Sequence, residues 1–121
     1  MKKSGAILDI ELAPYPIWLY LFDDRRKYRS AVNKHVKSVH ALSVAEASDC
    51  DGMCTLIDPG NIFMGIFNND GGTLAHELLH VIEHIIEHVP LGRGYTNSEA
   101  QAHLMGWMFR KCNEALKQGA K

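Results

Sequence analysis

The sequence has little of what marks several protein classes. Among its 121 residues are only three cysteines, Cys50, Cys54 and Cys112, which cannot all pair, so a disulfide-stapled secreted scaffold is not expected. Neither sign of charge dominates, since 13 basic and 14 acidic residues leave a net charge of −1, which argues against a protein whose whole surface binds nucleic acid. The apolar run from Ile17 to Phe22 is far too short to span a bilayer.

We also expect no targeting segment. Met1-Lys2-Lys3 begins as a signal peptide does, but Asp9 and Glu11 interrupt the apolar stretch that should follow. With 46% hydrophobic residues the chain can build a core of its own, so we expect a single domain over residues 1–121. These features predict a reduced, cytoplasmic protein with no membrane association.

The periodicity of apolar residues predicts an α+β domain. Residues 6–12 alternate as a half-buried strand does, whereas residues 17–22 fit either a second strand or the entry to a helix. The sheet is expected to be short and mainly antiparallel. The remaining expected elements are a helix capped by Asp23 or Asp24 and running to about His40, a hairpin of strands 53–57 and 62–67 around the turn 58–61, a helix from near Thr73 to before Pro90, and a last helix from the capping-box stretch 96–99 to about Lys117.

Histidine is more frequent here than is usual in soluble proteins, with seven among 121 residues, and its placement is not random. Four of the seven histidines, at positions 76, 80, 84 and 88, follow one another at four-residue steps. The stretch His76-Glu77-Leu78-Leu79-His80 matches H-E-x-x-H, in which residues one helical turn apart bring two imidazoles to one zinc ion. Glu77, next in sequence, can hold a metal-activated water as general base.

The surrounding helix is amphipathic, with the motif on its polar side. A solvated face of interleaved Glu and His is the alternative to a zinc site, and it would make the protein a helical domain with no metal chemistry. The expected apolar arc is Leu74, Leu78, Leu79, Val81, Ile82, Ile85, Ile86 and Val89, and the polar arc is His76, Glu77, His80, Glu83, His84, Glu87 and His88.

A catalytic zinc needs a third protein ligand. Glu83 and Ile86 occupy the positions at which the extended H-E-x-x-H-x-x-G-x-x-H pattern needs glycine and histidine, so that pattern is excluded. Glu99 is the candidate, because it lies 19 residues after His80, in the first turn of the next expected helix. The competing role for Glu99 is a capping-box acid that reaches back to Thr96.

The pair of motifs His76-Glu77-x-x-His80 and Asn97-Ser98-Glu99-Ala100 resembles the gluzincin metallopeptidases, the thermolysin-like group. The short chain, with a hairpin directly before the motif helix, resembles the minimal zincins of bacteria and phages over roughly residues 53–110. The resemblance implies a zincin-like domain that hydrolyses peptide bonds through a zinc-activated water, with Zn²⁺ on His76, His80 and Glu99 and Glu77 as general base. For a phage-encoded chain it implies the host cytoplasm.

The same resemblance implies further roles. The strand before the metal helix would be a sheet edge that pairs with a peptide substrate, with Gly65 permitting close approach. Where the family often has an aspartate that orients a zinc histidine, this chain has His103, a weaker hydrogen-bond acceptor. Tyr95 or His84 would stabilise the oxyanion. The implied substrate edge is Ile62, Phe63, Met64, Gly65, Ile66 and Phe67.

Three other interpretations stay open. A zinc-binding interaction module on a zincin scaffold, with little or no hydrolysis, would carry the same ligands as a peptidase. Cys50 and Cys54 have a metal-ligand spacing but lack a second pair, so buried or loop thiols are favoured there. The basic side of the first helix is most simply a solvated face, and contact with nucleic acid or an acidic partner is the less favoured alternative.

Overall fold

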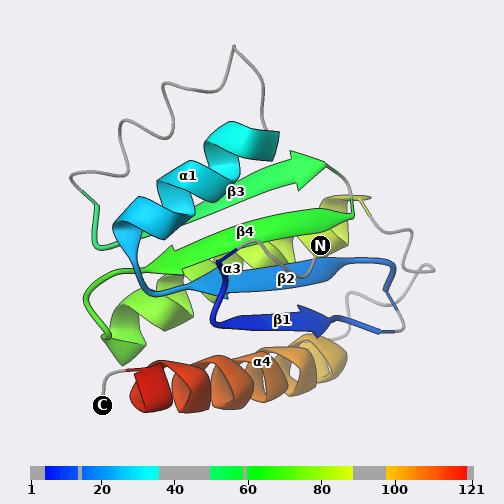
Figure 1. The fold of residues 1–121 in the computed structure, drawn as a ribbon. Coiled ribbons are helices and arrows are strands. Elements are labelled where there is room, and N and C mark those ends of the chain that lie inside the picture. Colours follow the sequence, from blue (N-terminus) through cyan, green and yellow to red (C-terminus); the bar gives the residue numbers. More distant parts are fainter. Residues whose placement is uncertain (1–4, 14, 36–49, 59, 89–97, 120–121) are drawn as a thin grey trace.

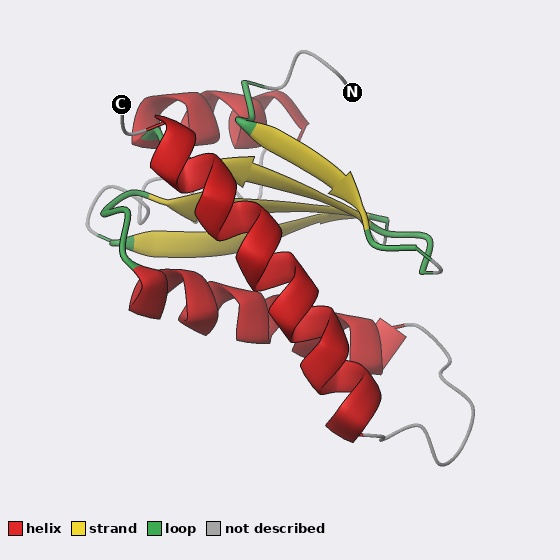
Figure 2. Ribbon diagram, turned by 90° about the horizontal axis from the view of Figure 1, so that it is seen from below, coloured by secondary structure: helices red, strands yellow, loops and turns green. Residues whose placement is uncertain are grey.

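The structure, a computed structural model, describes residues 5–13, 15–35, 50–58, 60–88 and 98–119, with the backbone alone at 88 and 98–100. A four-stranded sheet lies between α1 on one face and α3 on the other, and α4 packs against α3 while running diagonally past the β1 side of the sheet (Figures 1 and 2), which confirms the α+β class. The described elements in chain order are β1 (Leu8–Glu11), β2 (Trp18–Phe22), α1 (Arg25–His35), β3 (Gly52–Asp58), β4 (Asn61–Ile66), α3 (Gly71–His88) and α4 (Ser98–Gly119).

The sheet is mixed. Its strand order is β1-β2-β4-β3, with antiparallel pairs at both ends and a parallel β2–β4 pair between them. The expected β3–β4 hairpin is confirmed. Its turn is held by Asp58, whose Oδ1 accepts hydrogen bonds from the backbone N–H of Gly60 at 2.8 Å and the side-chain amide of Asn61 at 3.0 Å.

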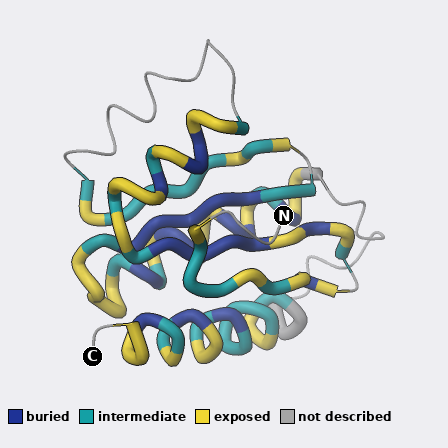
Figure 3. Tube along the Cα trace, viewed as in Figure 1, coloured by how far each residue is buried: buried dark blue, intermediate teal, exposed yellow. Residues whose placement is uncertain are grey.

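The run at 17–22 forms a strand, because both of its faces are covered. Leu19 and Leu21 pack toward α3 and α4, whereas Tyr20 and Phe22 pack toward α1. A continuously apolar strand is typical of a position buried on both faces of a sheet. The dark band in the centre of Figure 3 is this strand with its parallel neighbour β4.

Helix α1 begins where the sequence predicts. Oδ1 of Asp24 accepts hydrogen bonds from the backbone N–H groups of Arg26 at 2.9 Å and Lys27 at 3.1 Å, which satisfies two donors that a helix start leaves open. Tyr28 and Val32 are fully buried against the sheet. The expected helix end near His40 lies outside the described residues.

Helices α3 and α4 enclose the larger core. Asp70 caps α3 through a 3.2 Å hydrogen bond from the Thr73 N–H, so the helix starts slightly earlier than expected, at Gly71. From α4, Met108, Cys112 and Leu116 reach the same core. Among the described residues, no helix combines the length and apolar character needed to cross a bilayer.

The expected apolar arc of α3 is wrong at two positions. Leu79 is 54% exposed and Ile86 is 40% exposed, whereas Glu77, expected on the polar side, is only 7% exposed. The buried side of the helix is centred nearer to Glu77 than the expected arc, so Glu77 faces β3 and Leu79 and Ile86 lie outside the core. The buried stripe of α3 is Leu74, Leu78, Val81, Ile82 and Ile85.

The expected substrate edge, Ile62 to Phe67, is also wrong. β4 is an inner strand, because β2 pairs with one side of it and β3 with the other, and β3 is the edge strand next to α3. Gly65 has a different role from the one expected. A Cβ atom there would lie 2.4 Å from the Phe67 ring and 3.1 Å from the Tyr28 ring, so the glycine makes room for internal aromatic packing.

Candidate active site

A cleft of about 390 Å³ lies between β3 and α3, and we call it the β3–α3 cleft. From α3, the side chains of Glu77, His80 and His84 line it. The opposite wall includes Cys54 and Leu56 and is largely apolar. The structure therefore gathers three of the four titratable side chains at positions 76, 77, 80 and 84 around one hollow beside the sheet edge.

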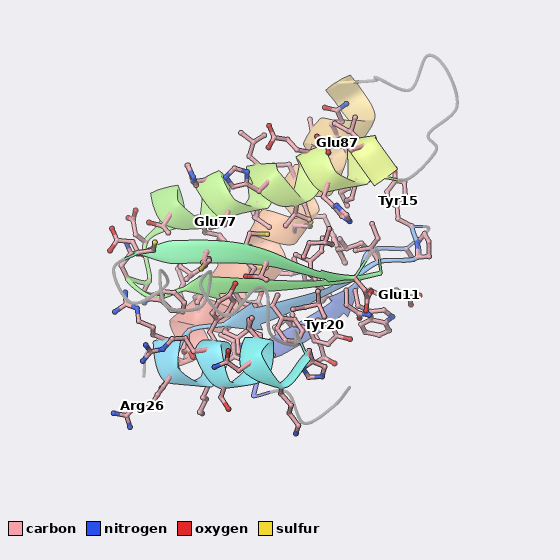
Figure 4. The ribbon with its side chains drawn as sticks, turned by 90° about the horizontal axis from the view of Figure 1, so that it is seen from above. Glu11, Tyr15, Tyr20, Arg26, Glu77 and Glu87 are labelled. Atoms are coloured by element: carbon pink, nitrogen blue, oxygen red, sulfur yellow. The ribbon has the colours of Figure 1, made fainter. Side chains whose placement is uncertain are left out.

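Glu77 is the buried charged residue of the described chain, at 7% exposure. It lies between α3 and the sheet (Figure 4). Burial raises the pKa of its carboxyl, and the nearby imidazoles of His76 and His80 partly oppose that rise. A carboxylate that is partly desolvated and beside a cleft is suited to accept and return a proton.

His76 and His80 lie one turn apart on the exposed side of this carboxylate. Their ring centroids are 5.1 Å apart with 78° between the ring planes, and Nε2 of His76 is 4.0 Å from Oε2 of Glu77. Nδ1 of His80 lies 3.2 Å from Oε1 of Glu83. With Nδ1–H donating to that carboxylate, Nε2 of His80 carries the lone pair that binds a metal ion.

The donor set fits a zinc ion in part. Two imidazoles on successive helical turns are the nitrogen ligands that the H-E-x-x-H arrangement offers to a zinc ion. Among the described side chains, no three metal-ligating residues are grouped so that they could hold one ion. Glu99 lies in the first turn of α4, but its side chain is outside the described residues, and both its ligand role and its capping role stay predictions.

The other expected site residues differ in whether the structure describes them and in whether they line the cleft. His84 lines the cleft one turn beyond His80. His103 is exposed on α4, and it is not among the described residues that line the cleft. Tyr95 lies outside the described residues. Of the two side chains expected near an oxyanion, the structure describes only His84, which lines the same cleft as Glu77 and His80.

Two residues at the site escaped the sequence-based prediction. Gly52, at the start of β3, has no room for a side chain, because a Cβ atom there would lie 2.6 Å from Cγ2 of Thr73 and 3.1 Å from Cγ of Glu77. Cys54 lines the cleft, and burial together with the charge of Glu77 raises the pKa of its thiol to about 12. A glycine that opens a strand was the only available signal for Gly52. Cys54 was considered only for its spacing from Cys50, which does not indicate a position in this cleft.

Comparisons with protein-family models, with curated proteins and with solved structures gave no match for this chain.

Proposed function

We propose that the protein is a small zinc metallopeptidase. The observation that carries the proposal is the buried Glu77 carboxyl beside the imidazoles of His76 and His80, at a cleft that runs along an edge strand. His76 and His80 would hold the ion together with Glu99. A solvated polar helix face gives no reason for Glu77 to be buried, since an unpaired carboxylate is costly to bury.

Each residue then has a defined task. The zinc ion would supply Lewis-acid polarisation of a carbonyl and would lower the pKa of a water toward about 7. Glu77 accepts a proton from the attacking water and delivers it to the leaving amine, and its burial keeps bulk water from competing for that proton. Glu83 orients the His80 ring through the 3.2 Å contact with Nδ1.

The substrate in this proposal is an extended peptide that pairs with β3. Within the described residues, β3 is bonded to β4 on one side only, so the backbone groups on its other side can pair with a further strand. Cys54 and Leu56 line the cleft from this strand, and Leu56 is 46% exposed, so a substrate side chain beside Glu77 meets an apolar surface.

The test combines zinc analysis with peptide cleavage. We expect stoichiometric zinc in the purified protein, and loss of zinc in His80→Ala and Glu99→Ala. Glu77→Gln should keep zinc and lower cleavage by about 10² or more, the range of general acid–base contributions. Glu87→Gln removes an exposed carboxylate of the same helix and should leave both readouts unchanged.

Two outcomes contradict the proposal in different ways. Protein that binds no zinc, or that keeps it in both ligand variants, removes the metal site. Zinc that is bound without any cleavage by the wild-type chain points to the interaction module instead of the peptidase.

A further inference from the structure

We propose that the outer face of α1 binds nucleic acid through the phosphodiester backbone, with duplex DNA as the ligand. We call this surface the basic face of α1, and its core is Arg26, Arg29 and Lys34, with Ser30 and Asn33 between them. It lies across the sheet from the β3–α3 cleft (Figure 4), so the inference does not rest on the proposed peptidase function.

Positive charge is concentrated on this helix. The 11 residues of α1 include five lysines and arginines and no acidic residue, in a chain whose net charge is −1. The remainder of the chain is therefore acidic overall, and a ligand with regular negative charge is attracted to this one helix more than to the molecule as a whole.

No ion pair within 4.0 Å holds the core cations among the described residues, although Arg26 lies close enough to the Asp24 carboxyl to help lower its pKa. Among the described residues, the ion pairs within 4.0 Å are His76–Glu77 and His80–Glu83, and neither involves α1. Arg25 is different from the other cations, because its guanidinium donates to the Cys50 carbonyl and lies 4.9 Å from the Phe67 ring centroid. Arg25 thus has an internal structural role, and we exclude it from the proposed surface.

Helical geometry points Arg26 and Lys34 outward, and Arg29 lies partly buried on the flank of the same helix. Tyr28, Ala31 and Val32 are buried against the sheet, so residues on the opposite side of the helix face away from the protein. Figure 4 shows the Arg26 side chain projecting from α1 on the side away from the sheet. At about 1.5 Å per residue the helix is roughly 16 Å long, enough to follow successive phosphates along a duplex.

The composition of the surface favours phosphates over other anionic partners. Arginine pairs with phosphate through two parallel N–H bonds, and hydroxyl and amide groups such as those of Ser30 and Asn33 add phosphate contacts. A membrane-binding helix needs large apolar side chains to insert, and a protein interface needs an apolar centre. The exposed large hydrophobic residues of the described chain, Trp18, Leu56, Leu79 and Ile86, all lie outside α1.

The test uses the full chain and a fluorescently labelled 20-base-pair DNA duplex, followed by anisotropy between 50 and 200 mM NaCl. Because each neutralised phosphate contributes about −0.9 to the slope of log K against log [salt], three contacts predict a slope of roughly −3. Arg26→Gln/Arg29→Gln/Lys34→Gln should weaken binding at 50 mM NaCl at least about tenfold and bring the slope close to zero.

The matched control removes the same charge elsewhere. Arg110→Gln/Lys111→Gln/Lys117→Gln takes three exposed cations from α4 and should keep binding within about twofold of wild type. Circular dichroism checks that both variants stay folded, as expected for substitutions on the surface. A wild-type chain that does not bind the duplex overturns the proposal, as does equal weakening in the two variants, which would mean that only net charge matters.

Two further binding measurements, with anionic vesicles and with an RNA duplex, identify the class of partner. Binding to vesicles with anionic phosphatidylserine but not to DNA would overturn the proposal in favour of a membrane surface. Preference for an RNA duplex of the same length would overturn the choice of DNA, since the narrow major groove of A-form RNA presents phosphates to an approaching helix differently.

Discussion

Gly52, at the start of β3, lies directly beside the Glu77 side chain of α3. A Cβ atom on Gly52 would lie 3.1 Å from Cγ of Glu77 and 2.6 Å from Cγ2 of Thr73. The buried position of Glu77 therefore depends on the missing side chain at position 52, which connects the start of the edge strand to the candidate general base.

Gly52→Ala is expected to lower the free energy of unfolding by about 1–3 kcal/mol and to displace Glu77, since overpacking a tight contact forces side chains from their preferred positions. Denaturant unfolding gives the first effect, and peptide cleavage with zinc content gives the second. Thr73→Ser removes the Cγ2 methyl group but keeps the hydroxyl that bonds the Asn68 amide at 2.9 Å. The double variant should regain part of the lost stability, and equal losses with and without Thr73→Ser would refute this account.

Leu78 and Leu79 offer a test of how α3 is oriented. Leu78 is fully buried, whereas Leu79 is 54% exposed. Leu78→Ala should cost about 2–5 kcal/mol of stability, as for other buried leucines, and Leu79→Ala less than about 1 kcal/mol. Comparable losses from the two adjacent substitutions, measured by urea unfolding, would mean that the helix faces the core differently.

Tyr28 connects α1 to the sheet. Its hydroxyl is hydrogen-bonded to the Thr55 hydroxyl and donates to the Phe63 carbonyl at 3.5 Å, and burial raises its pKa. Tyr28→Phe should cost about 1–2 kcal/mol, because it leaves buried partners without a hydrogen bond. The control is Tyr15→Phe, which removes a hydroxyl from a less buried ring and should change the unfolding free energy by under about 0.5 kcal/mol. Identical effects of the two substitutions would contradict the prediction.

The Asp24 cap predicts a pH dependence of stability. Hydrogen bonds from the Lys27 and Arg26 backbone lower the pKa of the Asp24 carboxyl in the folded state. A lowered folded-state pKa adds stability that is present above the unfolded pKa of about 3.9 and is lost as the pH falls through the folded value. Asp24→Asn keeps an oxygen acceptor without the charge, so the advantage of wild type over this variant should shrink as the pH falls below about 4.

Unfolding of both proteins at pH 7 and pH 3 measures this effect. Asp51→Asn, which removes another exposed carboxylate, should show no comparable change in its difference from wild type. Asp24→Ala, which also loses the acceptor, should cost about 1 kcal/mol at pH 7. A wild-type advantage over Asp24→Asn that is the same at both pH values would rule out the charged cap.

The parts of the fold that depend on contacts between residues close in sequence could be predicted from the sequence. The Asp24 cap and the turn at Asp58 follow from short-range hydrogen bonds, and the spacing of His76 and His80 follows from helical geometry. The assignment of residues 62–67 to the sheet edge was wrong because strand order depends on the β2–β4 pairing, between segments far apart in the chain.

The candidate site could be predicted only in part, for a related reason. Helical periodicity places Glu77 next to two histidines, but its burial depends on β3 and on the space at Gly52, neither of which the helix pattern contains. Leu79 was assigned to the core because helical periodicity does not determine where the buried side of a helix ends and the exposed side begins. The third ligand, Glu99, stays a prediction, since its side chain lies outside the described residues.

The parallel pairing of β2 with β4 has a consequence for how quickly the chain folds. The β1–β2 and β3–β4 pairs join segments close in sequence, whereas Trp18 and its partner Asn61 are 43 positions apart. Loop-closure entropy must be overcome before such a distant pair gains any contact energy. We therefore expect the two hairpins to form early and their joining to limit the rate, so the Glu77 cleft, built on the second hairpin, begins to take shape before the sheet is complete.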